Sequence, residues 1–243
     1  MIKLERKEKP EYLSNEKVAE LTERFKINKK DTVWKHTDIH SALLLSSSSK
    51  CAFCEAQLQT GTAYMEIEHF KDKDTYPEHV VDWENLLPSC KRCNTTKGTH
   101  DVVTEPIINP FDTDPKEHLT QAVCRIYFKT QLGESTRDVL NLNDDRLLRL
   151  RFETWNYVIN QVESIYYDME RKTTLNRRER NKLANLLTSC QSDRAFSGFA
   201  STALHQSVEY TKIIALLKNH NLWDDHLELL HTSSLNLILD CRT

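Results

Sequence analysis

The chain has 243 residues, of which 39% are hydrophobic and 28% are charged, and its formal net charge is −3 at pH 7. This is the composition of an ordinary globular protein, and the length suffices for one large domain or two small ones. No apolar run is long enough for a transmembrane helix, and the charged N-terminus leads into no signal-peptide core. We therefore expect a cytoplasmic protein without a membrane partner.

The first 50 residues are predicted to be helical. Apolar residues recur at helical spacing after a Ser-Asn pair that suits a helix cap. These residues are Leu13, Val18, Leu21 and Phe25. A second helix is predicted from Trp34 to Leu45, followed by a run of four serines. We expect both helices to pack on the segment that comes next.

That segment holds four of the seven cysteines, in two Cys-x-x-Cys pairs. The pairs are Cys51/Cys54 and Cys90/Cys93. In a reducing compartment such pairs are metal ligands more often than disulfides, and four thiolates suit a tetrahedral zinc ion. The sequence therefore predicts a structural zinc site.

Polar residues between and just after the pairs suit phosphodiester hydrolysis, which needs a base, a Lewis acid and help for the leaving oxygen. A strand predicted from Thr62 to Phe70 would carry Glu68 and His69 at its end. His69 is the candidate base because imidazole titrates near neutral pH. Glu68 is a hard oxygen ligand suited to Mg²⁺ or Mn²⁺. A loop would follow over residues 71–81.

A helix is predicted from Cys90, with Lys97 near its end. Asn94 on this helix can supply a second, neutral oxygen ligand to a catalytic metal. Lys97 lies on the same helix face one turn later, where it can meet a phosphate oxygen. Asn85 has a different expected role: its side chain can bond backbone groups of the preceding loop and so orient His69.

Two clusters of cations stand out against the small net charge, and local basic patches can attract phosphates. The first cluster crowds the cysteine segment and comprises Lys71, Lys73, Lys91, Arg92 and Lys97. The second comprises Arg171, Lys172, Arg177, Arg178, Arg180 and Lys182. A charged helix face is usually only a solvated face, so for the second cluster both readings stay open.

The rest of the chain reads as a connector and then a helical bundle. A strand is predicted over residues 123–131, with a partner near residues 136–140. Further helices are predicted from Asn143 onward and over about residues 176–190, 199–219 and 223–231. The predicted fold is mainly α with a small α+β part. Its predicted segments are 1–50 (N-terminal helices), 51–105 (zinc module), 106–142 (connector with short strands) and 143–243 (helical domain).

The zinc module resembles the HNH endonuclease family in its four-cysteine form. The resemblance is carried by Cys51-Ala52-Phe53-Cys54, Glu68-His69-Phe70, Asn85-Leu86-Leu87, Cys90-Lys91-Arg92-Cys93-Asn94 and Lys97-Gly98. It implies a ββα-metal module in which His69 is the general base and Asn85 is the central structural Asn. It also implies that Glu68 and Asn94 hold a divalent catalytic ion. Because Asn94 and Gly98 stand where some members have His, a weakly held Mg²⁺ or Mn²⁺ is expected.

A wider resemblance is to the PtuB-type HNH proteins of Septu and retron anti-phage systems. It is carried by Ile107-Ile108-Asn109-Pro110, Asp112-x-Asp114-Pro115, His118-Leu119 and Leu140-Asn141-Leu142-Asn143. It implies a nuclease effector that cleaves DNA, or structured RNA such as tRNA, beside an ABC-type ATPase of the PtuA type. In a retron complex, a reverse transcriptase with its RNA–DNA product would be a further partner.

Two other functions remain open from the residues themselves. The first is a catalytically silent zinc-binding adaptor whose helical half docks a partner protein or nucleic acid. The second is a nuclease that acts alone. The small basic surplus argues against the second, because duplex binding at physiological salt usually needs many phosphate contacts.

Overall fold

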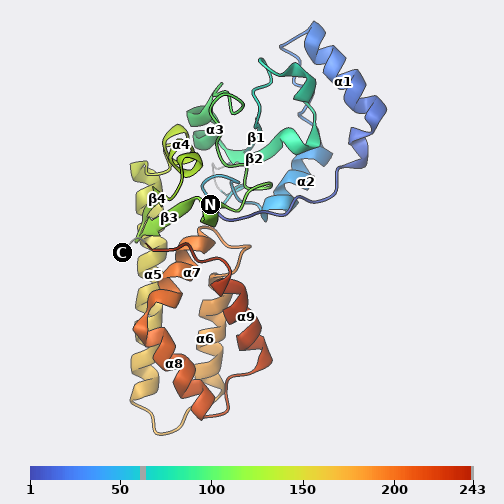
Figure 1. The fold of residues 1–243 in the computed structure, drawn as a ribbon. Helices are drawn as coiled ribbons and strands as arrows, with labels where there is room; N and C mark the ends of the chain where they lie inside the picture. Colours follow the sequence, from blue (N-terminus) through green and yellow to red (C-terminus); the bar gives the residue numbers. More distant parts are fainter. Residues whose placement is uncertain (61–63, 242–243) are drawn as a thin grey trace. The chain divides into compact units, whose positions relative to one another are not determined.

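The computed structural model describes residues 1–60 and 64–241, which group into two compact units (Figure 1). The N-terminal unit consists mainly of residues 3–118 and 128–142, and the C-terminal unit of residues 119–127 and the chain from Asn143 onward. Within the described residues, no helix is both long enough and apolar enough to cross a membrane. The fourfold division of the chain expected above stays a prediction.

The N-terminal unit begins with the two predicted helices, α1 (Asn15–Ile27) and α2 (Thr37–Ser47), after a short 3₁₀ helix, η1 (Glu11–Leu13). The Ser14 hydroxyl caps α1 by accepting a hydrogen bond from the Lys17 amide. Leu13, Leu21 and Phe25 are buried, as their helical spacing predicts. Helix α2 packs on the strands of the zinc module.

Two antiparallel strands and a helix form the centre of this unit: β1 (Met65–His69), β2 (Leu86–Cys90) and α3 (Lys91–Lys97). The register places Met65 opposite Cys90 and His69 opposite Leu86. Two 3₁₀ turns, η2 (Pro77–His79) and η3 (Trp83–Asn85), lie in the loop between the strands. The predicted strand and helix are confirmed over these ranges, although the predicted strand start, Thr62, lies outside the described residues.

Beyond the zinc module come η4 (Pro115–Glu117), the paired strands β3 (Leu119–Ala122) and β4 (Arg125–Phe128), and helix α4 (Gln131–Val139). The strand predicted over residues 123–131 is thus confirmed in part, but its predicted partner is wrong. Residues 136–139 belong to α4, and β4 pairs with the preceding strand instead. The cause is local, because the Thr130 hydroxyl caps a helix at this point by accepting from the Gly133 amide.

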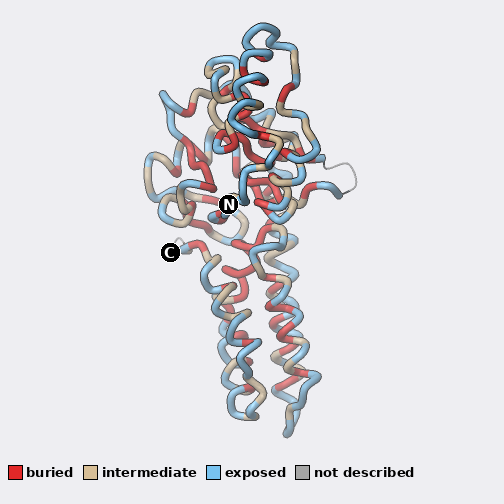
Figure 2. Tube along the Cα trace, turned by 90° about the vertical axis from the view of Figure 1, so that its right-hand side faces the viewer, coloured by how far each residue is buried: buried red, intermediate tan, exposed pale blue. Residues whose placement is uncertain are grey.

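The C-terminal unit is a bundle of five helices: α5 (Asp145–Glu170), α6 (Arg177–Ser189), α7 (Ser197–Gln206), α8 (Val208–Asn219) and α9 (Asp225–Leu235). Helix α5 packs on α6, α7 and α8 through a buried stripe that includes Val158, Val162, Ile165 and Met169. Figure 2 shows buried and exposed positions alternating along these helices.

The single helix predicted over residues 199–219 is wrong in one respect, since it is two helices. Ser207 has an extended backbone (φ −74°, ψ 127°), which ends α7. Its hydroxyl then accepts from the Tyr210 amide at 3.3 Å and caps α8. A serine that can cap a helix also interrupts one, and periodicity alone does not show which occurs.

Candidate metal centre and active site

The four predicted zinc ligands come together in the N-terminal unit. The sulfur atoms of Cys51, Cys54, Cys90 and Cys93 all lie within 4.8 Å of one another, and the Cys54 and Cys90 sulfurs are 3.7 Å apart. A tetrahedral zinc with Zn–S bonds of about 2.3 Å places its ligand sulfurs about 3.8 Å apart. The cluster therefore fits a structural zinc ion that joins the turn after α2 to the start of α3.

Backbone hydrogen bonds hold the two halves of this cluster in place. The Ala52 amide donates to the Pro88 carbonyl at 2.9 Å, which ties the first Cys-x-x-Cys turn to β2. The Cys90 sulfur accepts from the Cys93 amide at 3.5 Å and caps α3. The Arg92 guanidinium lies 3.6 Å from the Cys93 sulfur, where its charge favours a thiolate.

His69 ends β1 and is 8% exposed. Its Nε2 is 2.9 Å from the Val80 carbonyl oxygen. Because a carbonyl oxygen only accepts hydrogen bonds, Nε2 carries the proton, and the neutral ring has its lone pair on Nδ1. The Trp34 ring packs edge to face on the imidazole, with centroids 4.7 Å apart. Burial lowers the pKa of His69 to about 4. The imidazole is therefore neutral at pH 7, with Nδ1 able to take a proton.

A cleft of about 780 Å³ opens beside His69. It is lined by residues from the segment before α2 and its first turns, from β1, from the loop after β1 and from α3, among them Trp34, Lys35, Glu66, Lys73 and Asn94. Asn94 was predicted as a site residue, and the structure brings it to the same cleft as His69. Glu66, Trp34 and Lys35 were not predicted as site residues. Glu66 could have been, since it precedes Glu68 by two residues on a strand and so lies on the same strand face. No sequence pattern identifies Trp34 or Lys35 as cleft residues.

Glu68 and Lys97 pair with each other at the buried side of α3. The Glu68 Oε1 atom is 2.7 Å from the Lys97 ammonium, which also donates to the His69 carbonyl at 3.0 Å. Burial raises the pKa of Glu68 to about 7, and the Lys97 charge opposes that shift. The Lys97 side chain is fully buried and does not line the cleft, contrary to the exposed position that a phosphate contact would require. The metal-ligand role of Glu68 stays a prediction.

Asn85 closes the loop between the two strands. Its Oδ1 accepts from the Lys71 amide at 2.7 Å, and its Nδ2 donates to the Lys71 and His79 carbonyls at 3.1 Å each. The side chain is buried. Because these bonds span the loop up to the residue before Val80, they fix the backbone whose carbonyl holds the His69 ring. This geometry suits the orienting role expected of Asn85.

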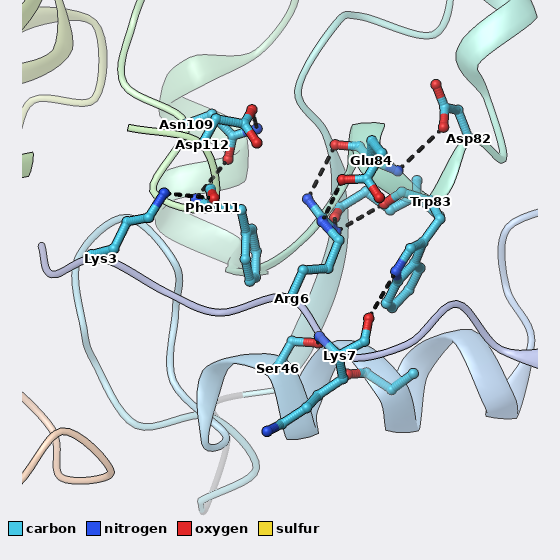
Figure 3. Close-up of polar contacts among 12 residues, drawn as sticks. Lys3, Arg6, Lys7, Ser46, Asp82, Trp83, Glu84, Asn109, Phe111 and Asp112 are labelled. Atoms are coloured by element: carbon cyan, nitrogen blue, oxygen red, sulfur yellow. Dashed lines mark hydrogen bonds and ion pairs between the residues drawn. The ribbon is translucent and has the colours of Figure 1, made fainter. Parts of the chain in front are cut away.

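The turn that carries Asn85 is itself held from the N-terminal segment of the chain (Figure 3). The Arg6 guanidinium donates to the carbonyls of Trp83 and Leu86 at 2.8 Å each, and to that of Glu84 at 3.1 Å. No sequence pattern predicts this contact, because the acceptors are backbone groups 77 to 80 positions away. Arg6 thus fixes the turn from which Asn85 reaches the loop between β1 and β2.

Replacing Asn85 by Ala should destabilise the N-terminal unit by about 2 kcal/mol, since it removes three hydrogen bonds and leaves buried backbone groups unpaired. Thermal unfolding and amide exchange of residues 71–80 measure the effect. Asn160→Ala, at an exposed position of α5, is the control and should shift stability by less than about 0.5 kcal/mol. Equal stability of both variants would contradict the role of Asn85.

The second basic cluster is partly neutralised within the C-terminal unit. Lys172 and Lys182 both pair with Asp168, and Arg180 pairs with Asp224 at 2.8 Å. The neighbouring side chains of Arg171 and Arg178 line an open cavity of about 440 Å³. Contact of this face with nucleic acid stays a prediction.

Comparison with known proteins gives a consistent family. No protein-family model matches the chain. It is 35% identical to the Septu protein PtuB of Bacillus thuringiensis, in an alignment of 249 positions, gaps included, that covers 99% of this chain and 96% of that protein. It is also 30% identical to a Septu protein PtuB of Bacillus mycoides strain KBAB4, over 35% of this chain and 39% of that protein. A Septu protein PtuA of the same strain is 25% identical over 49% of this chain and 22% of that protein. Since the first similarity spans nearly the full length of both proteins, the chain belongs to the PtuB family of Septu proteins.

Proposed function

We propose that this protein is a metal-dependent HNH endonuclease that hydrolyses phosphodiester bonds and acts as the effector of an anti-phage defence complex. One observation carries the proposal. A neutral imidazole, His69, is held by the Val80 carbonyl at the wall of a cleft that also presents the Asn94 carboxamide. The strand, loop, strand and helix around it suit a ββα-metal module stapled by zinc.

In this mechanism a water molecule attacks the scissile phosphorus while His69 Nδ1 takes its proton. The P–O bond to the leaving group breaks, and the leaving oxygen takes a proton from solvent. Asn94 in the cleft would hold a Mg²⁺ or Mn²⁺ ion, which when bound neutralises charge on the phosphate and on the leaving oxygen. Glu68 is paired with Lys97 and does not line the cleft, so its role as a second ligand stays a prediction. The donor set suits a hard cation. Lys97 pairs with the Oε1 atom of Glu68 at 2.7 Å.

Two cations in the cleft are better placed than Lys97 to bind substrate phosphates. Lys35 is exposed, and Lys73 lies 5.7 Å above the Trp34 ring and 3.3 Å from Asp74. Both line the cleft beside His69. We therefore assign phosphate binding to Lys35 and Lys73, and assign to Lys97 the support of Glu68.

The double variant Lys35→Ala/Lys73→Ala should bind nucleic acid more weakly. The slope of log affinity against log salt concentration should also be smaller in magnitude by about two, one for each lost phosphate contact. Fluorescence anisotropy at several salt concentrations measures both effects. Lys91→Ala removes an exposed cation of the same module that does not line the cleft, and it serves as the control. If the double variant and the control bind alike, the cleft is not the substrate site.

The defence role and the partners rest on the family. Membership among PtuB proteins of Septu systems supports a PtuA-type partner, which the resemblance described above implies is an ABC-type ATPase. A cytoplasmic location is part of the proposal. The partial similarity of the chain to one PtuA shows common sequence and not association, so the complex itself needs a test. A reverse transcriptase with its RNA–DNA product is a further proposed partner, from the resemblance to retron systems.

The test is cleavage of plasmid DNA and total tRNA in Mg²⁺ or Mn²⁺, with and without the ATPase, and again after EDTA. Metal-dependent cleavage of either substrate supports the nuclease and identifies its target. Silence in every condition from a folded, zinc-loaded protein would refute it. Binding that needs no divalent ion would then favour the zinc-binding adaptor.

A further inference from the structure

Strand β1 and helix α3 are joined by two side-chain pairs. The buried pair is Glu68 with Lys97, described above. The second pair lies at the cleft, where Asn94 Nδ2 donates to Glu66 Oε2 at 2.6 Å. The sequence spacing explains why both pairs form. Glu66 and Glu68 are two apart and share a face of β1, and Asn94 and Lys97 are three apart and share a face of α3. Only the second pair lines the cleft beside His69.

The pair at the cleft determines which way the Asn94 amide faces. A carboxylate has no proton to give, so Glu66 can bond only the NH₂ group of Asn94 and never its oxygen. Within residues 1–60 and 64–241, no donor is bonded to Asn94 Oδ1. That oxygen is the atom that a hard divalent cation takes from an asparagine.

We propose that Glu66 is a positioning residue, which orients Asn94 so that Oδ1 and not Nδ2 is offered to the catalytic metal. The inference rests on the proposed function, which makes Asn94 a metal ligand. Without Glu66, the Asn94 amide loses the hydrogen bond that holds Nδ2 on one side and Oδ1 on the other. Loss of such a supporting contact typically weakens metal binding or activity by about 10- to 100-fold.

Binding of Mn²⁺ to the zinc-loaded full-length chain, followed by electron paramagnetic resonance, tests this without any need for cleavage. Gln at position 66 keeps an acceptor oxygen for Asn94 but lacks the charge, whereas Ala keeps neither. Glu66→Gln should retain most of the wild-type affinity, while Glu66→Ala should lose about 10- to 100-fold. Asn94→Ala should lose affinity as well, and Glu66→Ala should add little to it, because both changes remove one contribution.

Three results would overturn the proposal: Glu66→Gln as weak as Glu66→Ala, Glu66→Ala as tight as wild type, or no Mn²⁺ bound by wild type. A Glu66→Gln variant as weak as Glu66→Ala would show that the Glu66 carboxylate itself binds the metal. Zinc content and thermal unfolding show whether each variant is folded, and Glu23→Ala, an exposed residue of α1 outside the cleft, is the control. Cleavage assayed in parallel separates the two claims. Glu66-dependent Mn²⁺ binding without cleavage refutes only the nuclease, and cleavage with Glu66-independent binding refutes only this inference.

Discussion

A chain that carries Cys90→Ser should fail to fold its N-terminal unit. Zinc binding by four-ligand sites contributes about 10–16 kcal/mol, as much as the whole net stability of an ordinary domain. Cys90 is also where three features meet: it ends β2, its sulfur caps α3, and it lies 3.7 Å from the Cys54 sulfur. The substitution therefore separates the first Cys-x-x-Cys turn from the strands that carry His69.

Zinc content by mass spectrometry and limited proteolysis of residues 51–98 measure this effect. Cys124→Ser is the matched control, since Cys124 is half-buried and belongs to no metal cluster among the described residues. It should bind one zinc per chain and resist protease like wild type. A Cys90→Ser chain with full zinc and unchanged protease resistance would show that the four sulfurs are not a structural metal site.

Loss of the His69 imidazole should reduce cleavage by about 10²- to 10⁴-fold, the usual contribution of a general base. Two substitutions separate catalysis from structure. His69→Ala also removes the hydrogen bond to Val80, worth about 1 kcal/mol, whereas the amide of His69→Gln can still donate to that carbonyl. Both variants should show this loss of cleavage, and the Gln variant should be the more stable.

Cleavage rate, zinc content and melting temperature of the two variants check this prediction. His100→Ala is the control, because His100 belongs to the same unit but does not line the cleft. It should keep wild-type activity. If His69→Gln cleaves as fast as His100→Ala, the imidazole is not the base.

The features that could be predicted from the sequence are those that depend on neighbours along the chain. The spacing of Cys51, Cys54, Cys90 and Cys93 predicts the metal cluster because few other structures bring thiols together at that spacing. The helical stripe from Leu147 to Tyr166 predicts α5 because a long periodic pattern has few alternatives.

The features that could not be predicted depend on packing between distant segments. Spacing correctly places Asn94 and Lys97 on one face of α3, but only the position of β1 shows that Asn94 reaches the cleft while Lys97 is buried against Glu68. The contribution of Trp34 and Lys35 to the cleft depends on where α2 packs. Helix α4, which Thr130 caps, is missed for a different reason, since a threonine is typical both of a strand and of a helix cap.

Whether the cleft at His69 hydrolyses phosphodiester bonds can be tested in one comparison. Wild type and His69→Gln, matched for zinc content, are incubated with plasmid DNA and total tRNA in Mg²⁺ together with the PtuA-type ATPase. We expect the wild type to cleave at least one substrate and the variant to cleave neither. Equal cleavage by both proteins would place the activity elsewhere and exclude His69 as the base.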